Sequence, residues 1–137
     1  MPVTLDVDHQ QQTTRVTVIG DITIEDVRVH LGEEGERTGL GFRELIDASR
    51  ATVTFSSEDA RRIVEILKKL GGKSALGPTA IIVSDDLTYG MIRMIGSLLD
   101  EICEIRAFRI AERHKAEEWL ETAPIVVKKP DGNNTGA

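Results

Sequence analysis

The sequence has few of the features that mark secreted, membrane or nucleic-acid-binding proteins. It contains one cysteine, Cys103, so no internal disulfide can form, and we expect a reducing, cytoplasmic setting. No apolar run approaches the roughly 20 residues needed to span a bilayer. The first residues, MPVTLDVD, lack the basic segment and apolar core of a signal peptide. A net charge of −6, with scattered Lys and Arg and 4% aromatic residues, argues against binding to nucleic acid.

Residue patterns for metal or catalytic chemistry are also missing. The three histidines, His9, His30 and His114, lack ligand spacing, so we expect no metal site and no cofactor. No Gly-x-Ser-x-Gly turn is present to position a nucleophile. Segment 32–41, GEEGERTGLG, has four glycines but lacks the Gly-Lys-Ser/Thr ending of a phosphate-binding loop, so we interpret it as a flexible connection. The sequence therefore favours a non-enzymatic protein, with an enzyme of unrecognised type as the weakest alternative.

Residues 79–110 indicate a strand, a helix and a second strand. The run TAIIV at 79–83 is rich in β-branched residues and does not alternate, which is typical of a strand covered on both faces. Ser84, Asp85 and Asp86 follow and suit the start of a helix. We favour this capping role for Asp85 and Asp86 over a paired-carboxylate site. A helical pattern then covers 87–102, and 104–110 is the next strand.

The rest of the chain extends this unit. Strands are predicted at 3–8, 15–19 and 42–48, and helices start near Thr23, near Ser56 and at Glu112. The fold class is therefore α/β, a single layer of mostly parallel sheet with an antiparallel N-terminal edge strand and crossover helices, in the order β-β-α-β-α-β-α-β-α. We predict one domain over 1–121 and a flexible C-terminal tail over 122–137.

The helix at 87–102 has an apolar arc wider than one sheet contact requires. Either a neighbouring helix covers the excess, or its N-terminal half forms a ligand or partner surface. Gly90 and Gly96 leave little bulk where another backbone could approach. Because Asp85 and Asp86 would repel an anion, a chain-like or uncharged apolar ligand is favoured over a phospholipid. The candidate surface residues are Tyr89, Met91, Ile92 and Met94.

Several short segments resemble one family. YGMIRM at 89–94, IRAFR at 105–109, AEEWL at 116–120 and GDITIED at 20–26 resemble the SpoIIAA-like (STAS/CRAL-TRIO-type) family of small bacterial proteins. The resemblance implies a sheet with helices packed as βα turns and no known reaction. It also implies a binding module for an apolar or lipid-like small molecule or for a protein partner. Transient membrane association is left open, and the sequence does not indicate the oligomeric state.

Anti-sigma-factor antagonists share this broader fold and suggest an alternative function. They are switched by a serine phosphorylated within an Asp-Ser-Ser-Gly pattern, and Ser57, preceded by Ser56, would match that serine. The flanking residues here are Phe55 and Glu58, which depart from the pattern. The competing interpretation is that Ser56 is a helix N-cap paired with Asp59. The alternative is therefore a phosphorylation-dependent regulator switched at Ser57.

Overall fold

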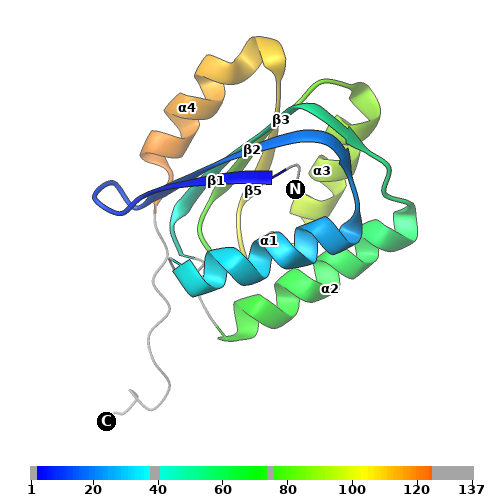
Figure 1. The fold of residues 1–137 in the computed structure, drawn as a ribbon, viewed down its shortest axis with the longest axis horizontal. Coiled ribbons are helices and arrows are strands. Elements are labelled where there is room, and N and C mark those ends of the chain that lie inside the picture. Colours follow the sequence, from blue (N-terminus) through cyan, green and yellow to red (C-terminus); the bar gives the residue numbers. More distant parts are fainter. Residues whose placement is uncertain (1–2, 38–40, 74–75, 125–137) are drawn as a thin grey trace.

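The computed structural model of the chain describes residues 3–37, 41–73 and 76–124 (Figure 1). Five strands form one sheet in the order β1-β2-β3-β4-β5. The strands are β1 (Val3–Asp8), β2 (Thr13–Ile22), β3 (Arg43–Val53), β4 (Thr79–Val83) and β5 (Ile105–Arg109). Strand β1 pairs antiparallel with β2, and all other pairs are parallel. The predicted element order and the antiparallel edge strand are confirmed.

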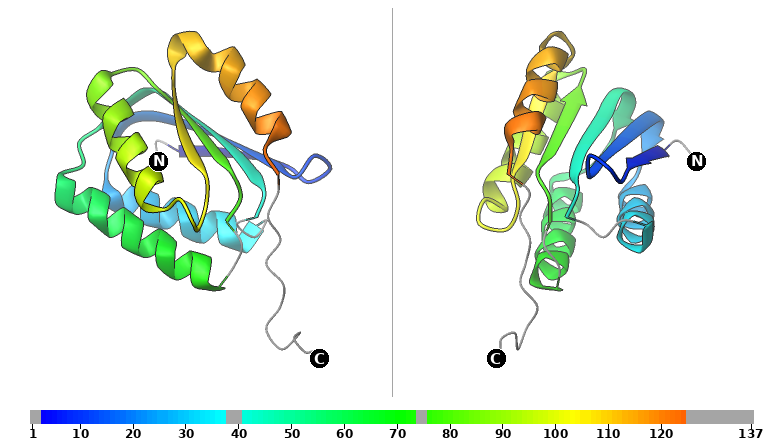
Figure 2. Two further views of the ribbon diagram at one scale, coloured as in Figure 1. Left: turned by 180° about the vertical axis from the view of Figure 1, so that it is seen from behind. Right: turned by 90° about the vertical axis from the view of Figure 1, so that its left-hand side faces the viewer.

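The helices cover the two faces of the sheet unequally. The crossover helices α1 (Ile24–Arg37), α2 (Ser57–Lys73) and α3 (Asp86–Leu98) connect successive parallel strands. Because right-handed crossovers that advance in one direction place their helices on one face, these three lie together. After a short 3₁₀ turn, η1 (Ile110–Glu112), helix α4 (Arg113–Thr122) covers the opposite face (Figure 2). Among the described residues, no helix is long and apolar enough to cross a membrane.

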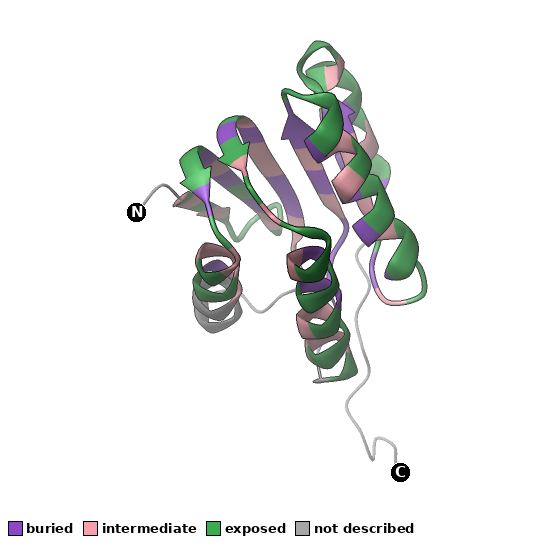
Figure 3. Cartoon of the chain, turned by 90° about the vertical axis from the view of Figure 1, so that its right-hand side faces the viewer, coloured by how far each residue is buried: buried purple, intermediate pink, exposed green. Residues whose placement is uncertain are grey.

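The buried apolar residues form three clusters. Leu45 of β3, Ile82 of β4 and Phe108 of β5 pack against α4. Trp119 of α4 is partly buried and packs against this core, so it helps to dock the last helix on the sheet. A second cluster comes from β2 and β3, and a third lies mainly between α2 and α3. Figure 3 shows that the buried positions gather in the strands while the outer sides of the helices are exposed.

Two predicted strands were too short. Strand β2 was expected to end at Ile19 but continues to Ile22, and β3 was expected to end at Ala48 but continues to Val53. The two strands stay paired in parallel, with Ile22 opposite Val53. A register shift between Thr17 and Ile19 and a positive φ of 85° at Gly20 accommodate this pairing. Gly20 therefore supplies a left-handed conformation inside a strand and does not terminate it.

Two predicted helix boundaries were also wrong. Helix α1 extends through residues 32–37, which had been assigned to a flexible connection. Glu and Arg, which are good helix formers, outnumber the two glycines in this stretch. Helix α3 ends at Leu98 and not at 102, because the N–H of Leu99 bonds the carbonyl of Gly96 and the chain turns toward β5. Residues 38–40 of the predicted connection lie outside the described residues.

The packed part of the chain reaches slightly beyond residue 121. Helix α4 ends at Thr122, and Ala123 is 4% exposed. The Arg43 side chain donates its Nε–H to the Ala123 carbonyl at 3.1 Å, which fixes the end of α4 beside the start of β3. Residues 125–137 of the predicted tail lie outside the described residues.

Candidate functional site

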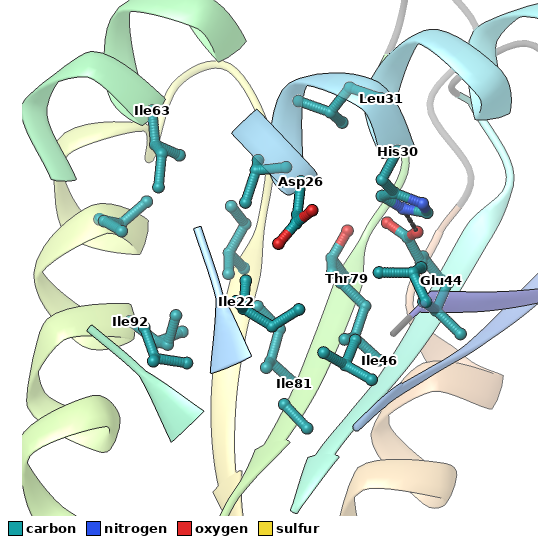
Figure 4. Close-up of a pocket in the computed structure, with 18 of the residues that line it drawn as sticks. Ile22, Asp26, His30, Leu31, Glu44, Ile46, Ile63, Thr79, Ile81 and Ile92 are labelled. Carbon is teal, nitrogen blue, oxygen red and sulfur yellow. Dashed lines mark hydrogen bonds and ion pairs between the residues drawn. The ribbon is translucent and has the colours of Figure 1, made fainter. Parts of the chain in front are cut away.

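An apolar cavity of about 180 Å³ lies between the sheet and the crossover helices (Figure 4). The floor of the cavity is formed by residues of the sheet. The residues next to them along each strand point the other way, toward α4. Ile46 of β3 and Ile81 of β4 point into it, whereas Leu45 and Ile82 belong to the opposite core. Because successive strand residues point to opposite faces of the sheet, alternate apolar residues either pack against α4 or line the cavity. Further wall residues include Val16, Val18, Ile22, Val27, Leu31, Val53, Phe55, Ile63, Leu67, Ile95 and Ile105.

The two helices beside the cavity begin with the same hydrogen-bonding motif. In α1, the Asp26 N–H donates to Thr23 Oγ1 at 3.2 Å, and the Thr23 N–H donates to Asp26 Oδ2 at 3.0 Å. In α2, Ser56 and Asp59 exchange the equivalent bonds at 3.0 and 3.1 Å. Reciprocal bonds of this kind satisfy N–H groups that a helix start leaves unpaired. Both helix starts are therefore fixed by local sequence.

One end of the cavity is polar. His30 of α1 and Glu44 of β3 are 8% and 7% exposed, and both line the cavity. Their Nε2 and Oε2 atoms lie 2.9 Å apart. A Glu44 carboxylate can only accept, so the His30 Nε2 carries the proton in this bond. The pair joins α1 to the sheet inside a mostly apolar space.

The second nitrogen of His30 lacks a partner. Nδ1 is buried and forms no hydrogen bond with the described residues. Buried polar atoms are nearly always paired, because an unpaired one costs about 1–3 kcal/mol. The other polar groups of the cavity already have bonds, since Asp26 caps α1 and the Thr79 hydroxyl donates to the Gly77 carbonyl at 3.4 Å. His30 Nδ1 is therefore a fully buried polar atom whose hydrogen-bonding capacity is unused among the described residues.

The four surface residues predicted on α3 do not come together. Ile92 is buried and lines the cavity. Met91 packs against the core shared by α2 and α3. Met94 is 41% exposed. Tyr89 lies beneath Arg109, whose guanidinium carbon is 4.1 Å from the ring centroid. Tyr89 thus contributes to a polar surface beside β5, away from the cavity.

The two aspartates before α3 have structural partners. Asp85 is the N-cap, as expected, and accepts the Thr88 N–H at 2.8 Å and the Thr88 hydroxyl at 3.0 Å. Asp86 forms an ion pair with Arg109 on β5. The two carboxylates therefore act separately, one on the helix start and one on the neighbouring strand.

The serines before α2 also have distinct places. Ser56 caps the helix through Asp59, as the capping interpretation predicted. Ser57 is the first helical residue and is exposed. The predicted phosphorylation site is therefore accessible, and the cap does not use its side chain.

The one thiol is not activated. Cys103 is buried in the core beside α2 and α3, and burial raises the pKa of its thiol to about 11. The side chain therefore stays protonated at neutral pH, where only the thiolate would be a strong nucleophile. Among the described residues, no three His, Cys, Asp or Glu side chains lie close enough to hold a metal ion.

Sequence reasoning missed the His30–Glu44 pair. His30 had been set aside because the three histidines lack ligand spacing. A signal was nevertheless present: His30 follows Val27 by three positions and so belongs to the apolar stripe of α1. Glu44 lies two positions before Ile46, on the inward face of β3. A titratable residue on the inward side of each of two neighbouring elements points to a buried pair.

Comparison with known proteins establishes the fold. No protein-family model and no curated protein matches the chain by sequence. Among solved structures, it is similar to an uncharacterized protein of the DUF3478 family with a SpoIIAA-like fold from Shewanella loihica PV-4. The TM-score is 0.55 at 19% identity, over 86% of this chain and 93% of the other. The SpoIIAA-like fold expected from the sequence is thus confirmed, and at this identity the likeness concerns the fold alone.

Proposed function

We propose that this protein is a non-enzymatic binding module that holds an apolar or lipid-like small molecule between the sheet and helices α1 and α2. The observation that carries the proposal is the cavity of about 180 Å³ whose lining is mostly aliphatic, with a polar end at His30 and Glu44. Interiors are normally packed without voids of this size, because each void forfeits dispersion contacts. An apolar ligand would restore those contacts.

The cavity volume limits the ligand. Dry apolar cavities of about 150 Å³ in other proteins accept a single benzene ring. A cavity of about 180 Å³ therefore suits one ring or a short chain. A longer chain would extend beyond the cavity, which is not fully enclosed. Ile92 is the one residue of the predicted α3 surface that would touch the ligand.

Binding can be tested by thermal shift with a panel of toluene, octanol and decanoate. A ligand that binds only the native state raises the stability by about 2.7 kcal/mol at one hundred times its Kd. Ile46→Phe should fill the cavity and abolish the shift with toluene, whereas Ile46→Ala should enlarge it and admit longer chains. Met94→Asp changes an exposed residue of α3 and should leave the shift unchanged. Absence of a shift with every ligand would refute the proposal.

A protein partner on α3 is a second candidate, favoured by one observation. Leu87, Met94 and Leu98 are 77%, 41% and 51% exposed and recur at helical spacing along one stripe. Such a stripe suits an amphipathic helix of a partner. Leu98→Glu should abolish capture of that partner, and Ser97→Glu, on the adjacent exposed position, should not. Equal capture by both variants would exclude this surface.

Regulation at Ser57 also remains a proposal. Its support is that Ser57 is exposed while Ser56 holds the cap, so a phosphate on Ser57 would leave the capping bonds in place. The free N–H groups of the first turn of α2 favour an added negative charge. The neighbouring acidic residues, Glu58 and Asp59, oppose it. The Ser57→Asp test is described below.

A further inference from the structure

We infer that the α3 stripe, formed by Leu87, Met94 and Leu98, binds an amphipathic helix whose polar side is acidic, and that this helix lies along the line where α3 meets α2. The inference rests on the second candidate function above and specifies the chemistry of the partner. Two observations meet at this place. The stripe residues are exposed, and two exposed cationic side chains of α2 border the same line.

The stripe lies on the side of α3 that faces α2. Met91 follows Leu87 by four positions and precedes Met94 by three, so it belongs to the same row on the helix surface. Its side chain packs against the core between α2 and α3. The row is therefore closed below by Met91 and open to solvent at Leu87, Met94 and Leu98.

The cationic residues lie on the side of α2 that faces α3. Val64 packs in the core between the two helices. Arg61 precedes Val64 by three positions and Lys68 follows it by four, so both border Val64 on the helix surface. Gly71 comes three positions after Lys68, and a Cβ there would collide with the side chain of Ile102, just beyond the end of α3. Arg61 and Lys68 thus form a cationic rim beside the stripe.

The cationic rim has charge to offer to a partner. The next arginine, Arg62, is already paired with Glu58 and Asp59. Among the described residues, by contrast, neither Arg61 nor Lys68 forms an ion pair. Acidic side chains of a bound helix would supply the missing anions, and basic ones would be repelled. An apolar stripe with one cationic rim therefore selects an apolar face with an acidic flank.

An anionic membrane suits this surface less well than a helix does. Asp100 and Glu101 are exposed just beyond the Leu98 end of the stripe. A lipid surface would meet these carboxylates as well as the cationic rim, and anionic headgroups would repel them. A single helix can turn its acidic flank toward α2 alone.

Two synthetic helical peptides with the same leucine face serve as probes, one with a glutamate flank and the other with a lysine flank. Dissociation constants are measured by fluorescence anisotropy, and methyl NMR locates the site at Met94 and Leu98. The glutamate peptide should bind about 3- to 10-fold more tightly, because partly exposed ion pairs each contribute modestly. The variant Arg61→Glu/Lys68→Glu should invert this preference.

Matched variants control for net charge and for the apolar contact. Arg62→Glu/Lys69→Glu makes the same change of charge at exposed positions on the side of α2 away from α3, and it should keep the preference for the glutamate peptide. Leu98→Glu should abolish binding, whereas Ser97→Glu, at an exposed position one residue away, should weaken it far less.

The outcomes separate the acidic flank from the surface itself. Equal affinity for the two peptides, with shifts at Met94, would refute the acidic flank while the partner surface stands. If neither peptide shifts Met94, the partner surface fails as well. Binding to phosphatidylcholine–phosphatidylglycerol vesicles, or self-association, that Leu98→Glu abolishes would assign the stripe to a membrane or to a second copy and overturn the inference.

Discussion

Arg15 of β2 and Glu117 of α4 form a bidentate ion pair, with N–O distances of 2.8 and 2.9 Å, although they are 102 positions apart in the chain. The pair lies on the α4 face of the sheet, opposite the cavity. It connects the last helix to the N-terminal half of the sheet, beyond the strands that α4 packs on.

The Arg15–Glu117 pair should make stability depend on pH. The hydrogen bonds from Arg15 lower the pKa of Glu117, more than partial burial raises it. A lowered pKa in the folded state means that the contribution is complete above the unfolded value, about 4.3, and is lost as the pH falls through the folded value. Glu117→Gln should therefore cost about 0.5–1 kcal/mol near neutral pH and less at acid pH, since the pair is partly exposed.

The free energies of unfolding of the wild type and Glu117→Gln are measured by urea unfolding, followed by circular dichroism, near neutral pH and at acid pH. Glu121→Gln, an exposed change on the same helix, is the matched control and should cost less than 0.5 kcal/mol, roughly the usual limit for surface substitutions. A cost for Glu117→Gln that does not decrease at acid pH would show that the pair does not titrate as argued.

Two glycines of α3 should respond in opposite ways to alanine. A Cβ at Gly96 would lie 2.6 Å from the Ile105 carbonyl oxygen of β5, whereas a Cβ at Gly90 would meet nothing within 4 Å. Gly96→Ala should therefore destabilise the protein by about 1–3 kcal/mol through overpacking. Gly90→Ala should stabilise it by up to about 1 kcal/mol, because alanine is the better helix former. Thermal denaturation of the two variants measures both changes in stability. Equal changes for Gly96→Ala and Gly90→Ala would contradict the close approach of β5 to Gly96.

The fold could be predicted further than the site. Apolar runs such as 79–83 and the capping residues before α2 and α3 depend on neighbouring positions, so the sequence predicts them well. The length of β2 depends on its pairing with β3, which continues past Gly20 to Ile22. Local patterns place His30 and Glu44 on the inward sides of α1 and β3, but their pairing depends on α1 lying over β3, which no local pattern encodes. The position of Tyr89 also depends on a contact between elements, because its ring lies against Arg109 of the following strand.

Trp119 should stabilise the α4 face without dominating it. Its ring lies 6.1 Å from that of Phe108, and the Arg106 guanidinium carbon lies 5.2 Å from its centroid. Because the side chain is only partly buried, Trp119→Ala should cost about 2 kcal/mol, below the 3–5 kcal/mol typical of a fully buried tryptophan. Leu120→Ala, at a position that is 3% exposed, should cost at least as much. Urea unfolding of both variants tests this order, and a negligible cost for Trp119→Ala would show that α4 is held by Leu120 and Ala116 alone.

Substitutions at Ser56 and Ser57 can distinguish a structural role at the start of α2 from a regulatory role. Ser56 exchanges two hydrogen bonds with Asp59, so Ser56→Ala should cost about 1 kcal/mol of unfolding free energy. Ser57 is exposed and takes no part in those bonds, so Ser57→Ala should stay within about 0.5 kcal/mol of the wild type. Chemical denaturation of the two alanine variants gives both values. If Ser57 is a switch, Ser57→Asp should keep the wild-type stability and yet abolish capture of a protein partner that the wild type retains. Recovery of the same partners by wild type and Ser57→Asp would remove the regulatory function and leave both serines with the helix start alone.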